Sequence, residues 1–105
     1  MSVSNRFRDI ARDVADFLAQ LKTQDEANPQ ATQAVAKAGA ELADWSELVG
    51  EIPRMSLEFK LTPILLKAHN NLDRARLIFE ESELDAQADA AWELQQQIYR
   101  LLNDL

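Results

Sequence analysis

The chain's single histidine, His69, is the residue type best suited to acid–base chemistry near neutral pH. On a helix it would share one face with Asp73, Arg76 and Glu80, which follow at spacings of four, three and four residues. An aspartate one turn away can favour the charged imidazole. The sequence places no serine or threonine nucleophile beside this face. We therefore interpret it as a solvated helix face with ion pairs, and we expect no enzymatic activity.

Metal chemistry has similarly little support. Four acidic side chains gather within residues 80–85, but this stretch lacks the alternating oxygen ligands and central glycine of a calcium loop. Carboxylate metal sites in helical bundles use a Glu-x-x-His pair, whereas Leu66 stands three residues before His69. With no cysteine and one histidine, the usual Cys/His zinc sites are excluded. Phosphate-binding and dinucleotide-binding glycine motifs are missing too, so we expect no metal and no cofactor.

Composition indicates one helical domain of 105 residues. Hydrophobic residues make up 47%, which is enough for a core and argues against disorder. Two glycines and three prolines are too few for a many-turned β fold. No apolar run approaches the ~20 residues that span a bilayer. The N-terminus leads directly into an amphipathic pattern, so we expect no secretory signal and a cytoplasmic location.

The formal net charge of −7 opposes binding to nucleic acid and to anionic membranes, because both need clustered Lys and Arg. The charge is uneven along the chain. Residues 54–76 carry five basic and two acidic side chains, whereas residues 77–105 carry one basic and seven acidic side chains. This asymmetry predicts that a basic third helix lies beside an acidic fourth helix.

Apolar residues recur with helical period in four stretches, which predicts helices near residues 4–22, 29–50, 63–81 and 83–103. Asn28 followed by Pro29 is a strong start signal for the second helix. Gly50 is suited to end this helix in a left-handed cap. Ser82 and Asp85 resemble a capping box for the fourth helix.

Because the polar connection at residues 23–27 is short, the first two helices should be antiparallel neighbours. We expect an all-α, antiparallel four-helix bundle. Its second and third helices need not be adjacent, because an irregular connection at residues 51–62 separates them.

That connection allows two interpretations. Apolar and charged residues alternate over 57–61, as in a strand, but a lone strand has no partner in a helical chain. Helical phase suits the segment better. Either a helix begins near Ser56 and bends at Pro63, or Thr62 caps a helix whose first residue is Pro63. A proline inside a helix costs about 3 kcal/mol, so we favour Pro63 as the first residue.

Two helices have more packable surface than a one-sided helix needs. In the second helix a stripe of small residues runs roughly opposite the bulky apolar face, at Thr32, Ala36, Gly39, Ala43, Ser46 and Gly50. Small side chains allow another helix to approach closely, although an alanine-rich solvated face is the alternative. In the third helix Leu66 and Leu77, joined by Phe59, point away from the core face. Trp92 and Tyr99 flank the fourth, as core-border residues or as interface anchors.

These second faces predict a non-enzymatic protein–protein interaction module that self-associates as a homodimer. The candidate interface comprises Ala36, Gly39, Ala43, Ser46, Phe59, Leu66, Leu77, Trp92 and Tyr99. The alternative hypothesis is an acidic inhibitor of the antitoxin or immunity type, which neutralises a basic protein partner. It is favoured by the net charge of −7 and the small size. Salt dependence separates the two, because an apolar contact persists at high salt and a charge-steered contact weakens.

Overall fold

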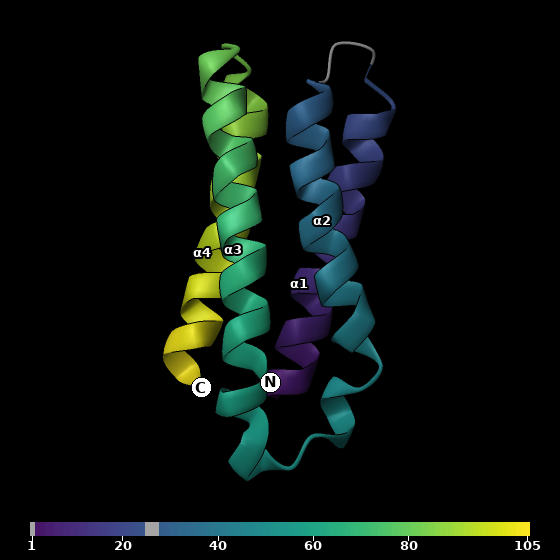
Figure 1. Ribbon diagram of the computed structural model, residues 1–105, viewed down its shortest axis with the longest axis vertical. Helices are drawn as coiled ribbons and strands as arrows, with labels where there is room; N and C mark the ends of the chain where they lie inside the picture. Colours follow the sequence, from purple (N-terminus) through teal and green to yellow (C-terminus); the bar gives the residue numbers. More distant parts are fainter. Residues whose placement is uncertain (1, 25–27) are drawn as a thin grey trace.

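In the described part of the chain, four α-helices run alternately up and down the molecule (Figure 1). They are α1 (Val3–Lys22), α2 (Pro29–Ser46), α3 (Leu57–Glu81) and α4 (Asp85–Asp104), and two short 3₁₀ helices, η1 (Val49–Glu51) and η2 (Arg54–Ser56), join α2 to α3. The computed structural model describes residues 2–24 and 28–105. Three of the five residues of the predicted 23–27 connection therefore lie outside the described residues. None of the described helices is long and apolar enough to cross a membrane.

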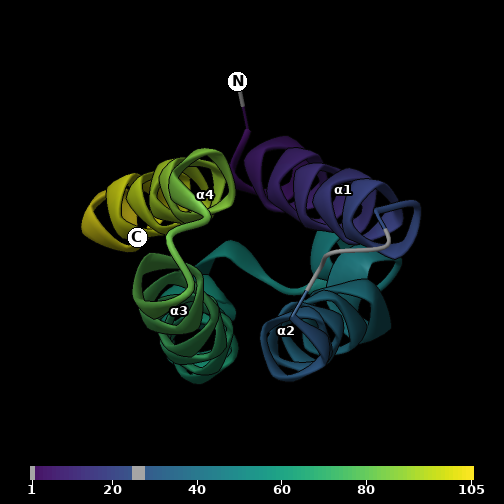
Figure 2. The ribbon, with the colours of Figure 1, turned by 90° about the horizontal axis from the view of Figure 1, so that it is seen from above.

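Seen along the bundle axis, each helix packs against the next in chain order, and α4 closes the ring against α1 (Figure 2). Helix α1 is thus diagonal to α3. The predicted antiparallel four-helix bundle is confirmed, and α2 and α3 prove to be adjacent. The principal extents are 43 × 22 × 20 Å.

Each helix contributes one apolar face to a shared core. Fully buried members include Phe7, Val14, Val35, Leu42, Leu61, Leu65, Leu72, Phe79, Ile98 and Leu101. Near the end of the bundle where α1 and α3 finish, the rings of Phe17 and Phe79 meet across the core, with centroids 6.1 Å apart and planes tilted by 60°. Such tilted aromatic pairs add to the stability gained from burial alone. The core faces that the helical period predicted are the faces that pack.

The start of α2 follows the prediction. The Asn28 side chain accepts hydrogen bonds from the backbone N–H groups of Gln30, at 2.9 Å, and Ala31, and Pro29 occupies the first helical turn. This satisfies N–H groups that have no partner inside the helix.

The predicted end of α2 is wrong. The helix stops at Ser46, and Gly50 lies in η1 without a positive φ. The Arg8 Nε donates to the Ser46 carbonyl at 2.9 Å, so a cation from α1 caps the negative end of α2. A Cβ at residue 50 would lie 2.7 Å from an Arg8 guanidinium nitrogen. Gly50 thus leaves room for the end of the flexible Arg8 side chain, and it forms no left-handed turn.

The favoured start of α3 is also wrong, because the helix begins at Leu57 and contains Pro63. The two helical turns before Pro63 bury Leu61 completely and Leu57 partly. Burying a leucine contributes about 1.5–3 kcal/mol, which offsets much of the cost of an internal proline.

The predicted capping box of α4 is not formed. Ser82 ends α3, and α4 follows Leu84, which provides no side-chain cap. Glu83 adopts a left-handed conformation with φ 60°, and the Leu84 N–H donates to the Phe79 carbonyl at 2.8 Å. This is the hydrogen bond of a Schellman cap, with glutamate where glycine is usual. Leu84 packs against the core, and that contact holds the turn in place.

Candidate interaction surface

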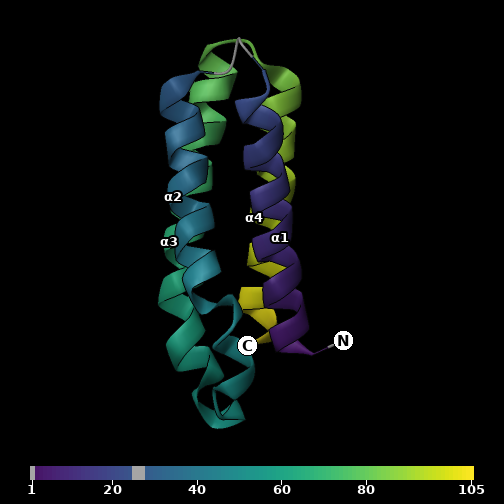
Figure 3. The same ribbon diagram turned by 90° about the vertical axis from the view of Figure 1, so that its right-hand side faces the viewer.

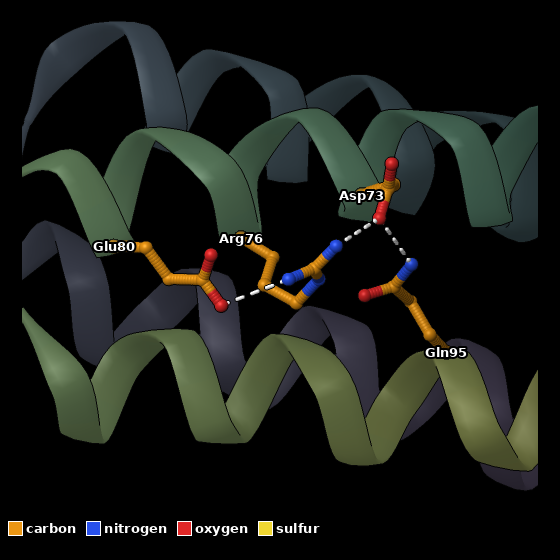
Figure 4. A network of polar contacts seen from close by, with 4 residues as sticks. All are labelled: Asp73, Arg76, Glu80 and Gln95. Atoms are coloured by element: carbon orange, nitrogen blue, oxygen red, sulfur yellow. Dashed lines mark hydrogen bonds and ion pairs between the residues drawn. The ribbon is translucent and has the colours of Figure 1, made fainter.

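The polar face of α3 forms the expected ion pairs. Arg76 donates from Nη2 to Asp73 Oδ1 and from Nη1 to Glu80 Oε1, both at 2.8 Å (Figure 4). On α4, Gln95 donates from Nε2 to the same Asp73 oxygen at 3.0 Å. The hydrogen bond from Arg76, followed by that from Gln95, lowers the pKa of Asp73 below its ordinary value. His69 makes no side-chain hydrogen bond or ion pair within the described residues.

Gln95 is a residue that the sequence reasoning missed. Its side chain is 1% exposed, and its Oε1 has no hydrogen-bond partner among the described residues. Its position, four residues after Ala91 and three before Ile98, puts it on the apolar face of α4, and that spacing was the available signal. Because Gln95 and Arg76 both bind Asp73, the cluster fixes how α4 lies along α3.

Metal binding finds no support in the described part of the chain. No group of three or more His, Cys, Asp and Glu residues there is arranged to hold a metal ion. A shallow hollow between α1 and α4 is lined by Arg6, Asp9 and Arg100. Arg6 is already paired with Asp104 at 2.6 Å, so this hollow is an ion-paired surface.

The small residues of α2 face a helix of the same chain at two points. A Cβ added to Gly39 would lie 3.6 Å from Val14 Cγ1 of α1. The Ser46 Oγ donates to the Leu42 carbonyl within α2, while the Ser46 carbonyl accepts from Arg8 of α1. Ala36 is half-buried and Ala43 is exposed. Close packing of the stripe at Gly39 and Ser46 is thus accounted for by α1.

Large apolar side chains are exposed on α3 and α4. The exposed fractions are 80% for Phe59, 46% for Leu66, 47% for Leu77, 49% for Trp92 and 55% for Tyr99. Two further residues that the sequence reasoning did not single out, Met55 at 98% and Leu48 at 48%, lie in the α2–α3 connection. The three α3 residues fall within about 20° of one another around the helix, opposite the buried Leu61, Leu65 and Leu72.

The exposed rings of α4 adjoin the same side of the molecule. The Trp92 ring lies 5.9 Å from the Arg76 guanidinium carbon, so it borders the polar face of α3. Tyr99 is two turns further along α4, on the same side of that helix. We name these five residues, Phe59, Leu66, Leu77, Trp92 and Tyr99, the α3–α4 outer face.

One end of this face projects beyond the bundle. The Asp73–Gln95 and Arg76–Trp92 contacts define an antiparallel pairing that places Asp104, the last residue of α4, beside about Ile64. The first turns of α3 therefore extend past the end of α4, as Figures 1 and 3 show at the lower end. Phe59 stands on this projecting part, which explains its high exposure.

In comparisons with known proteins, no family model matches the chain, and no curated protein or solved structure does so.

Proposed function

We propose that the protein is a non-enzymatic interaction module of the cytoplasm that self-associates as a homodimer through the α3–α4 outer face. The observation that carries this proposal is the concentration of five large, substantially exposed apolar side chains on two neighbouring helices. Single exposed leucines are ordinary, but several large apolar side chains gathered on one side of a molecule are typical of interaction sites. Trp and Tyr are also the residue types that most often anchor such contacts.

The dimensions of this face suit a stable dimer. Helix α3 has 25 residues and is therefore about 37 Å long. Two adjacent helices give a breadth of roughly 20 Å, because helix axes pack about 10 Å apart. The resulting footprint of roughly 700 Å² per copy is near the ~800 Å² per partner of standard interfaces. Covering a half-exposed leucine contributes about 1 kcal/mol per copy.

The test compares the molar mass of the protein with that of a Leu66→Gln/Leu77→Gln variant by sedimentation and light scattering. We expect the natural chain to be a dimer at tens of micromolar and the variant a monomer with an unchanged fold. Leu48→Gln is the matched control, because Leu48 is equally exposed at 48% but lies outside the outer face. A monomeric natural chain at several hundred micromolar would rule out self-association. If the Leu66→Gln/Leu77→Gln variant still dimerises, the contact between the copies lies on another face.

The acidic-inhibitor hypothesis is the second candidate, supported by the net charge of −7. Exposed acids on α4, such as Asp85, Asp89 and Glu93, suit a basic protein partner. For that function we expect a monomer that gives no dimer at 1 M salt and binds a basic protein fast, with an association rate that falls steeply as salt increases.

A further inference from the structure

A hollow between the adjacent helices α2 and α3 concentrates positive charge in an otherwise acidic chain (Figure 2). Its volume is about 240 Å³, and its lining consists of Gln30, Gln33, Ala34 and Lys37 of α2 with Arg74 and Ile78 of α3. These side chains include two cations, two amides and no acid. The local charge of the lining is therefore +2, whereas the net charge of the chain is −7.

The two cations of this hollow have no partner among the described residues. Lys37 and Arg74 are exposed and form no ion pair or side-chain hydrogen bond there, whereas three other arginines are ion-paired. Glu41, one turn after Lys37, lines the next hollow along the groove together with Lys67. Glu81 follows Arg74 by seven residues, or about 10 Å along α3, which is one Debye length at 0.1 M salt. Neither acid neutralises the pair.

We propose that this hollow binds a small phosphate monoester, with Arg74 and Lys37 as the cations that hold the phosphate group. A phosphate monoester carries close to two negative charges at pH 7 and offers three strong acceptor oxygens. The arginine fork can bind two of these oxygens side by side, and the lysine binds as a point charge. A carboxylate has only one charge and would leave one cation uncompensated.

The remaining lining suits the rest of such a ligand. The amide groups of Gln30 and Gln33 supply N–H donors for a further oxygen. Ala34 and the half-buried Ile78 provide an apolar floor for the organic part of the ester. The hollow lies on the side of α3 that packs against α2, so binding there does not depend on self-association through the α3–α4 outer face.

Titration with phenyl phosphate at pH 7 and 0.1 M salt, followed by NMR of the backbone amides, tests the site. We expect a millimolar Kd and chemical-shift changes that gather at residues 30–37 and 74–78. Lys37→Gln and Arg74→Gln should each raise the Kd about fivefold, because each removes one charged contact at an exposed site. Both positions are exposed, so the circular dichroism of the variants should be that of the natural chain.

The matched control is Lys60→Gln, which removes the same charge from an exposed position of α3 about 21 Å from Arg74 along the helix. It should leave the Kd within about twofold. Benzoate, which has the same ring and a single charge, should bind at least about fivefold more weakly than phenyl phosphate.

Two results would overturn the site itself. One is the lack of localised shift changes up to about 10 mM phenyl phosphate. The other is a Kd that rises as much in Lys60→Gln as in Lys37→Gln and Arg74→Gln. Benzoate binding as tight as that of phenyl phosphate would overturn the assignment to a phosphate group. None of these results bears on the molar mass that tests self-association.

Discussion

Replacing Gly39 by alanine should stabilise the fold. Gly39 lies inside α2 with ordinary helical geometry, and a glycine there costs about 1 kcal/mol relative to alanine. The added methyl would meet Val14 Cγ1 at 3.6 Å, an ordinary van der Waals distance with nothing nearer, so no atom has to move. Because the site is half-buried, the methyl adds roughly 0.4 kcal/mol more. We expect a total gain of about 1.4 kcal/mol.

For a chain of this size, that gain raises the melting temperature by about 6 °C. Thermal unfolding followed by circular dichroism at one fixed protein concentration measures it, since self-association makes Tm depend on concentration. Ala40→Gly is the control. Ala40 is the exposed neighbour of Gly39, so this change lowers the helix propensity without removing a packing contact. The Gly39→Ala/Ala40→Gly double variant then isolates the contact with Val14.

A Gly39→Ala variant that melts at or below the natural temperature would refute this reasoning. If the variant also became monomeric while the natural chain dimerised, a second copy would have to approach α2 at Gly39. The stripe of small residues would then be the interface. We expect the oligomeric state to be unchanged, because α1 already occupies this position.

Two further predictions concern polar contacts. The lowered pKa of Asp73 means that its ionised form stabilises the fold above its ordinary pKa of 3.8, and that this contribution is lost as pH falls through the lowered folded value. Between pH 5 and pH 2 the free energy of unfolding should therefore fall less steeply in Asp73→Asn than in the natural chain. Urea titration at each pH measures this free energy, and an equal fall in both proteins would contradict the prediction. Asn28→Ala should lower that free energy by about 1 kcal/mol at pH 7, because two N–H groups of α2 lose their acceptor. The exposed Asn103→Ala is its control, and equal losses in both variants would argue against a specific cap.

The sequence was sufficient for what depends on local chemistry and helical period. It identified four helices, their core faces and the Asn28 cap, because each depends on residues within one or two turns. It also placed the exposed leucines of α3 correctly, since Leu66 and Leu77 fall opposite a continuous apolar stripe.

The sequence was insufficient where contacts between residues far apart in the chain determine the structure. Local rules count the hydrogen bond that Pro63 removes, but they do not count the burial of Leu61 against other helices. Likewise, Gly50 suggested a left-handed cap, whereas the carbonyl of Ser46 at the end of α2 is bound by Arg8 from α1. The partner of the small stripe was undetermined for the same reason, because no pattern within α2 specifies which helix approaches Gly39.

The proline inside α3 also divides that helix mechanically. Pro63 has no N–H, so the backbone hydrogen bond to the carbonyl of Phe59 is missing where the projecting turns join the bundle. Among residues 57–63 only Leu61 is completely buried. Because Leu61 belongs to the core, any opening of these turns that spares the core stops short of it and is confined to the single turn at residues 57–60. The tip that presents Phe59 can fray over that turn while the rest of α3 keeps its hydrogen bonds.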